Sequence, residues 1–235
     1  MDNKLRIKIG KVEPKSEFFA PENATNHLGF LTERSPTIIA QGPPSMSFNA
    51  FYSPTESFTL AFGVYDAMWN KGRDENNFKL HSIFEASDLA FFLEGRFKWK
   101  SGINGLPGGI KIGGWRLDGE KPIYGGGQVD GTPGYYFVLD QTLTENGIGA
   151  YVQFGTADKQ VSALSRHVGV GMKWVGVFSE RENDIFGIGI SSVKFSDAIG
   201  SPFIKDSETA YEVFYKAPVT DWLTLQGDLQ AITNP

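Results

Sequence analysis

The stretch that decides the fold is SETAYEVFYKAPVTDWLTLQGDLQAITNP, residues 207–235. It predicts one β-hairpin with strands at residues 210–216 and 222–232. The turn at residues 217–221 contains Pro218, which has no N–H to give to a strand ladder. In the second strand, the odd positions from Leu223 to Ala231 are apolar or glycine, and the even positions between them are polar. The hairpin therefore has one apolar face and one polar face.

This alternation has two interpretations. In a soluble sheet the apolar face packs on a core and the polar face meets water. In an outer-membrane barrel the apolar face meets lipid and the polar face lines a wet lumen. Alternation in one hairpin favours the soluble interpretation, because the membrane signal of a single strand is weak. The rest of the chain has to decide.

The composition limits the classes of protein that are possible. The 235 residues suffice for one large all-β domain or two smaller ones. The net charge is −5 and there is no basic run, so nothing indicates a nucleic-acid partner. There are no cysteines, which excludes disulfides and thiolate zinc sites. No run of roughly 20 apolar residues occurs, so a transmembrane helix is not predicted.

Alternating segments recur along the whole chain. The most informative is Leu89–Trp99, where apolar and aromatic positions alternate with Phe92, Glu94, Arg96 and Lys98. Counting all such segments gives about eleven strands of roughly 8–13 residues, which suits tilted membrane-spanning strands better than soluble strands of about 5–6 residues. The predicted strands are residues 5–12, 45–52, 57–66, 89–99, 109–117, 135–143, 147–156, 167–179 and 184–195, together with the final hairpin.

Compact polar turns are expected at residues 53–56, 144–147, 180–183 and 217–221, and a glycine-rich loop at residues 125–134. This pattern predicts an all-antiparallel, strongly curved sheet whose strands are joined in sequence order, with no central helix. The apolar side of each strand is expected to face outward. Its test positions are Phe58, Leu60, Phe62, Phe91, Leu93, Phe97, Val168, Val170, Met172, Leu223, Leu225 and Leu229.

No motif indicates catalysis, a metal or a cofactor. His27, His81 and His167 lie far apart and lack metal-ligand spacing. The run Gly125–Gly127 lacks the strand–helix context of a phosphate loop. A carboxylate pair for glycoside hydrolysis could be chosen, but any all-β protein offers such pairs.

The charged residues share the polar side of their strands. A solvated sheet face explains each one singly, whereas a pore lining explains them together. Outward aromatic residues near strand ends, such as Trp99 and Trp174, suit an interfacial girdle but also suit a soluble core. The pore-lining candidates, with one aromatic among them, are Arg6, Lys8, Phe92, Glu94, Arg96, Lys98, Lys111, Asp140, Lys173, Glu212 and Asp228.

Several stretches resemble the carbohydrate-selective porin family of OprB type. In that family the last segment follows the pattern Val-Thr-x-Trp-Leu-x-Leu-Gln-x-Asp-Leu-Gln and then Ile-x-Asn-Pro, which residues 219–235 match. Residues 51–67, 134–158 and 168–191 are also similar. The resemblance covers nearly the whole chain.

The resemblance implies an antiparallel transmembrane β-barrel of about sixteen strands in the bacterial outer membrane. Its permeants would be mono- or oligosaccharides diffusing through a charged, water-filled lumen, with outer-membrane lipid around it. Residues 1–235 would then be a single barrel domain, incomplete at both ends and without the signal peptide. Whether the complete protein is a monomer or a trimer stays open.

Two alternatives remain, a soluble all-β carbohydrate-binding protein and a jelly-roll glycoside hydrolase. If the chain is a porin, the long proline-rich connection at residues 13–44 is a candidate to fold inward and narrow the pore. It would do so beside Glu94, Arg96 and Lys98, with Phe92 as a stacking face for a sugar. A row of charges that merely keeps the lumen wet is the other interpretation.

Overall fold

A computed structural model describes residues 4–24, 44–67 and 88–234. Its strands form one eleven-stranded sheet, in which every strand pairs with its neighbours in sequence. All the pairings are antiparallel. The strands are β1 (Leu5–Val12), β2 (Ser45–Tyr52), β3 (Phe58–Asp66), β4 (Leu89–Trp99), β5 (Gly108–Pro122), β6 (Gln128–Thr142), β7 (Ile148–Ala157), β8 (Leu164–Val175), β9 (Ile185–Phe195), β10 (Ser207–Thr220) and β11 (Leu223–Thr233).

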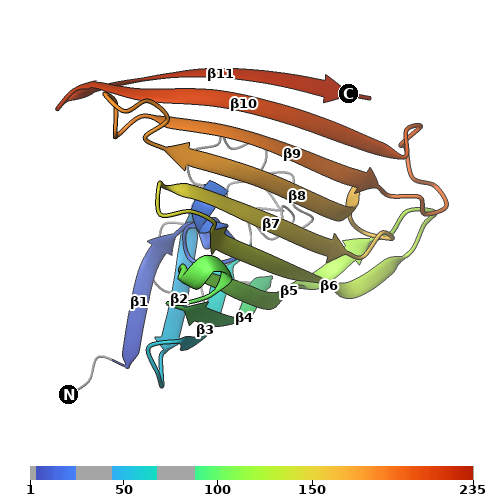
Figure 1. Cartoon of the computed structure of the whole chain (residues 1–235). Coiled ribbons are helices and arrows are strands. Elements are labelled where there is room, and N and C mark those ends of the chain that lie inside the picture. Colours follow the sequence, from blue (N-terminus) through green and yellow to red (C-terminus); the bar gives the residue numbers. More distant parts are fainter. Residues whose placement is uncertain (1–3, 25–43, 68–87, 235) are drawn as a thin grey trace.

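The sheet is strongly curved and open, with β1 and β11 as its two edges (Figure 1). Within the described residues the helical elements are short 3₁₀ turns, η1 (Pro14–Ser16), η2 (Glu22–Ala24) and η6 (Ile103–Gly105). In that part of the chain no helix has the length and apolar character needed to cross a bilayer. The predicted antiparallel, sequence-ordered and curved sheet is therefore confirmed.

The two faces of the sheet differ as the alternation predicts. Nine of the twelve test positions are exposed, led by Leu229 at 73% and Leu225 at 57%. The other three, Phe91, Met172 and Leu223, are half-buried. Residues of the opposite parity are buried on the central strands, including Ala61, Phe92 and Val138, whereas on the edge strand β11 Gln226 and Gln230 are exposed. The sheet thus leaves its apolar face exposed and covers the central part of its mixed polar and aromatic face.

The final hairpin turns later than its sequence predicts. Residues 217–220 belong to β10, and only Asp221 and Trp222 separate the two strands. Pro218 is tolerated inside β10 because β9 pairs with β10 only as far as Lys216, so no β9 partner needs a donor there. On the β11 side, the register shifts between Pro218 and Thr220. The predicted turn at residues 217–221 is therefore wrong in extent.

The glycine-rich loop is also shorter than predicted. Gly125, Gly126 and Gly127 all have positive φ angles and form the turn between β5 and β6. Gly131 and Gly134 instead lie within β6. The hairpin tip reaches the neighbouring loops, where the Tyr124 N–H donates to Gln160 O at 2.9 Å. The long β5–β6 hairpin is thus part of the rim.

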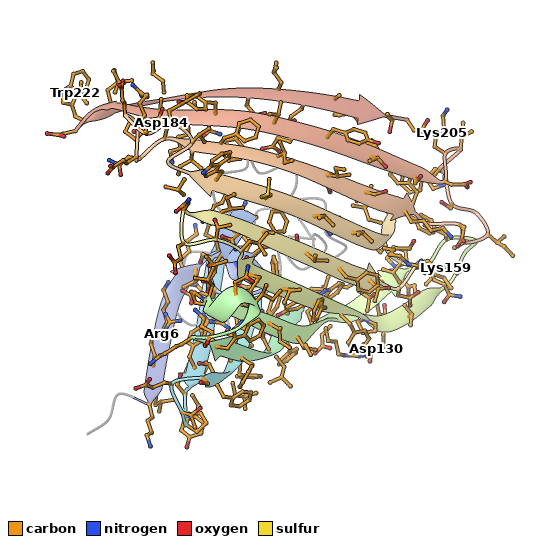
Figure 2. All side chains as sticks on the ribbon, in the orientation of Figure 1. Arg6, Asp130, Lys159, Asp184, Lys205 and Trp222 are labelled. Atoms are coloured by element: carbon orange, nitrogen blue, oxygen red, sulfur yellow. The ribbon has the colours of Figure 1, made fainter. Side chains whose placement is uncertain are left out.

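Connections alternate between two rims. One rim carries residues 53–57, 100–107, 143–147, 176–184 and 221–222, and the fully described connections of the other rim are residues 123–127, 158–163 and 196–206. Asp184 and Trp222 mark the first rim, and Asp130, Lys159 and Lys205 mark the second (Figure 2). Short connections occur on both rims, at residues 53–57 on the first and at residues 123–127 and 158–163 on the second.

In four direct cross-strand pairs of the described interior wall, an aromatic ring lies over a glycine of the neighbouring strand. A Cβ added at Gly134 would lie 2.2 Å from Trp115, and one at Gly113 would lie 2.3 Å from Tyr136. The pairs Gly171–Tyr151 and Gly187–Phe214 have the same geometry. Each ring therefore occupies the space that a side chain on the next strand would fill.

Candidate functional site

Residues 13–24, named here the inner segment, lie inside the curve of the sheet directly after β1 (Figure 1). The inner segment includes η1 and η2 and buries Pro14, Phe18, Phe19 and Ala24. Phe19 adopts a positive φ of 48°. The expectation that the connection after β1 folds inward is confirmed for these residues. Residues 25–43 lie outside the described part of the chain.

Aromatic packing seats the inner segment on the wall. The Phe18 ring stacks on Phe92, with centroids 5.1 Å apart and planes at 25°, and on Phe51 at 6.0 Å. The Phe19 ring meets Tyr136 edge-on at 5.6 Å. The expectation that Phe92 offers a stacking face to a sugar does not hold in this structure, because Phe18 and Phe19 pack on it and it is only 1% exposed.

Glu94 on β4 is fully buried beneath the inner segment. Its carboxylate accepts the backbone N–H of Phe19 at 2.8 Å and the Tyr136 hydroxyl at 2.8 Å. It also pairs with the Arg96 guanidinium. The carboxylate is thus committed to the protein and lies out of reach of a solute.

Asp140 on β6 holds the other end of the inner segment. Its two oxygens accept successive backbone N–H groups, that of Glu22 at 3.0 Å and that of Asn23 at 2.8 Å. These are the first two N–H groups of η2, which have no partner inside so short a helix. The Asn23 side chain adds a bond to Ala150 O at 3.2 Å.

Cations of the wall bind the carbonyl groups of the inner segment. Lys111 Nζ donates to Ala20 O at 2.7 Å, and the Arg96 guanidinium donates to Glu17 O. Lys98 Nζ forms an ion pair with the Glu22 carboxylate at 2.8 Å. Both of these side chains are more than half exposed, so this pair contributes little to stability but faces the solvent.

Glu17 is anchored to β1. Arg6 and Lys8 approach its carboxylate at 2.8 Å and 2.6 Å. Burial by itself raises the pKa of Glu17, but the hydrogen bonds and charges of Arg6 and Lys8 outweigh it and hold the pKa below its ordinary value. The same balance lowers the pKa of Glu22, where Lys98 supplies the main opposing effect.

A cavity of about 350 Å³ lies beside the inner segment. Its polar lining comes from η2, from β4, β5 and β6, and from the rim at residues 56, 57 and 100; it includes Glu22, Lys98, Lys111, Asp140 and Thr142. The lining offers both hydrogen-bond donors and acceptors. It sits within the size range of small-molecule sites.

Eight of the eleven predicted residues contact the inner segment. They are Arg6, Lys8, Phe92, Glu94, Arg96, Lys98, Lys111 and Asp140. The other three lie farther along the sheet. Lys173 is on β8, while Glu212 and Asp228 are on β10 and β11, where Gln230 Nε2 donates to Glu212 at 3.4 Å.

Sequence reasoning missed the residues of the inner segment itself. Phe18 and Phe19 lie between Pro14 and Pro21 in a connection without strand alternation. The one available signal is an adjacent pair of aromatic residues in an otherwise polar, proline-rich stretch. Of the three histidines, only His167 is described, and it is buried with Nε2 2.9 Å from Ser191 Oγ.

A family model described as carbohydrate-selective porin, OprB family, matches residues 1–235. The chain belongs to this family. Porin B of Pseudomonas aeruginosa is 24% identical over 177 residues, which cover 58% of this chain and 38% of that protein.

Two solved structures of Pseudomonas putida OprB share the fold. The high pH structure matches 100% of this chain and 66% of the solved chain, with a TM-score of 0.82 and 19% identity. The low pH structure matches 99% of this chain and 58% of the solved chain, with a TM-score of 0.61 and 19% identity. The chain therefore spans less than two thirds of the length of these relatives.

Proposed function

We propose that this chain forms much of the wall of a bacterial outer-membrane pore through which carbohydrates diffuse. Its membership of the carbohydrate-selective porin family supports this function. The observation that carries the proposal is a single curved sheet with two different faces. Its apolar face is exposed, and the inner segment packs on its charged face. This is the arrangement that lipid outside and water inside require.

The exposed apolar face would contact lipid, and the aromatic residues near strand ends would lie at the interfaces. Tyr52 and Tyr211 are about half exposed on this side, at 50% and 45%. A soluble carbohydrate-binding protein would have to keep the same face in water over the width of the sheet. No observation favours that alternative.

The permeation path would pass the cavity beside the inner segment. A neutral sugar has hydroxyl groups that both donate and accept, and the lining provides Lys98 and Lys111 as donors with Glu22 and Thr142 as acceptors. Lys173, Glu212, Asp228, Arg6 and Lys8 would line other parts of the lumen wall. Glu94 and Phe92 would not contact the permeant, because the inner segment covers them.

The test is transport by the full-length protein in liposomes and planar bilayers. Lys98→Ala should change the relative rates at which neutral sugars of different size and stereochemistry enter, since it removes a donor from the path. Lys205→Ala, at an exposed rim loop, is the matched control. Altered ion conductance with unaltered discrimination among sugars would show that Lys98 is only part of a wetted wall. A full-length protein that purifies in buffer without detergent would argue against a pore altogether.

A further inference from the structure

Two carboxylates of the wall, those of Glu94 and Asp140, are largely buried and are bound by the inner segment. Glu94 is 0% exposed and Asp140 is 8% exposed. An ionised carboxylate is costly to bury unless its oxygens receive hydrogen bonds or a counter-charge. Both receive such bonds, and in both cases the donors include backbone N–H groups of the inner segment.

These hydrogen bonds satisfy backbone N–H groups that would otherwise lack an acceptor. The inner segment lies against a sheet face and so has no neighbouring strand to bond its backbone. Glu94 accepts from Phe19, and Asp140 accepts from Glu22 and Asn23, at distances between 2.8 and 3.0 Å. Hydrogen bonds to a charged acceptor are roughly twice as strong as neutral ones.

Side chains of the wall also donate hydrogen bonds to carbonyl groups of the inner segment. Lys111 binds Ala20 O and Arg96 binds Glu17 O, while Gln153 Nε2 lies 3.5 Å from Phe19 O. The wall side chains come from β4, β5, β6 and β7, so four strands converge on one short piece of chain. Side chains of the wall therefore replace the strand ladder that the inner segment lacks.

We propose that Glu94 and Asp140 are positioning residues that fix the inner segment against the wall, and that this fixation sets the largest sugar that passes. The second half of the proposal rests on the proposed function, whereas the first half concerns the fold alone. Glu94 is covered by the inner segment, and both carboxylate oxygens of Asp140 accept its backbone N–H groups. The two carboxylates act through the backbone of the inner segment, whose position sets the width of the path beside Glu22.

The experiment uses the full-length protein with Ser16→Cys as a spin-label site in the inner segment. This chain has no cysteine of its own, so the label has no competing site within it. Asp140→Asn keeps the side-chain shape but leaves one of two N–H groups facing an amide nitrogen, which cannot accept. Glu94→Gln keeps an acceptor for Phe19 but loses the charge that Arg96 pairs with. Glu145→Gln, in the exposed turn between β6 and β7, is the matched control.

In Asp140→Asn the ratio of mobile to immobile label should rise about tenfold, the effect expected from losing one charge-assisted bond. Glu94→Gln should raise it less, and Glu145→Gln not at all. The size limit for neutral oligosaccharides should increase in the same order, with unchanged β-sheet circular dichroism. If Asp140→Asn prevents barrel formation, Glu94→Gln provides the comparison.

A label that stays immobile in both variants would overturn the positioning role. A freed label with an unchanged size limit would overturn the link to pore width. If the unmodified protein passes no sugar while the label behaves as expected, the proposed function fails and the positioning role stands.

Discussion

At the scale of single residues, Phe18 is one of two buried aromatic side chains that pack the inner segment on the wall. It lies between Phe51 and Phe92, and the Arg96 guanidinium lies 5.9 Å from its ring centroid. The side chain is 1% exposed although it belongs to a connection and not to a strand. The Phe18 ring thus packs the inner segment on the wall, together with Phe19, while the carboxylates bind its backbone.

Phe18→Ala should release the inner segment. Replacing a buried phenylalanine by alanine costs about 3–5 kcal/mol, and here that loss falls on one short segment. A label at residue 16 should become mobile while the sheet stays intact by circular dichroism. Phe203→Ala, which removes a ring stacked on Phe195 at 4.8 Å in the rim loop, should leave the label unchanged. Equal mobility in both variants would contradict this role for Phe18.

The docking of the inner segment should also depend on pH. The folded-state pKa values of Glu17 and Glu22 lie below the ordinary value of 4.5. Their ion pairs with Arg6, Lys8 and Lys98 therefore contribute fully above pH 4.5 and are lost as the pH falls through the lower folded values. Label mobility should stay constant from pH 7 to about pH 5 and rise only under more acid conditions.

Replacing both carboxylates in Glu17→Gln/Glu22→Gln removes their share of this response. The double variant should show higher mobility at neutral pH and a smaller further rise in acid. A release midpoint above pH 4.5 in the unmodified protein would contradict the lowered pKa values.

At the scale of elements, the glycine–aromatic pairs make β5 and β6 fit together. Gly134→Ala would place a methyl group 2.2 Å from Trp115, so the ring or the strand has to move. Overpacking of this kind costs roughly 1–3 kcal/mol. Gly227→Ala on β11 is the control, since nothing lies within 4 Å of its added Cβ. Thermal unfolding in detergent should separate the two variants, and equal midpoints would show that the rings yield freely.

The strands of the sheet are predictable from the sequence, whereas the ends of some turns are not. Strand alternation predicted every strand of the sheet because it reports directly which side chains are covered. Turn chemistry misplaced the end of β10, because Pro218 lies where β9 no longer pairs and its missing N–H costs nothing. It overextended the loop at Gly131 and Gly134 for a related reason. Gly134 is required by the ring of Trp115 on the neighbouring strand, which local sequence does not reveal.

The candidate site was predictable only on its wall. Charges on the polar parity of β4, β5 and β6 were found by alternation, and eight of eleven candidates gather around one segment. The inner segment that these charges bind was not predictable. Phe18 and Phe19 lie in a stretch without strand alternation, and their partners lie up to 134 residues away in the sequence. The burial of Glu94 and Asp140 depends on those distant contacts.

At the scale of the whole molecule, the exposed apolar face runs across the full width of the sheet. Leu5, Ile7 and Ile9 belong to it on β1, and Leu225 and Leu229 belong to it on β11. Seven of the ten charged candidate residues lie on the other face, around the inner segment. In a porin these are the lipid side and the water side of one wall, so a single added charge should distinguish them.

Val170→Arg places that charge at the centre of the apolar face. Val170 is 47% exposed and lies on β8 between Val152 and Ile190, far from either rim. An arginine at mid-depth on a lipid-facing strand should cost about 2–4 kcal/mol of barrel stability.

Ile199→Arg is the matched control, because Ile199 is an exposed apolar residue in the loop between β9 and β10, where an arginine would remain in water. Refolding of the full-length protein into lipid vesicles, followed by denaturant titration, measures both variants. Loss of stability in Val170→Arg alone would establish lipid on this face, and equal stability in the two variants would mean that the face meets water and that the pore assignment fails.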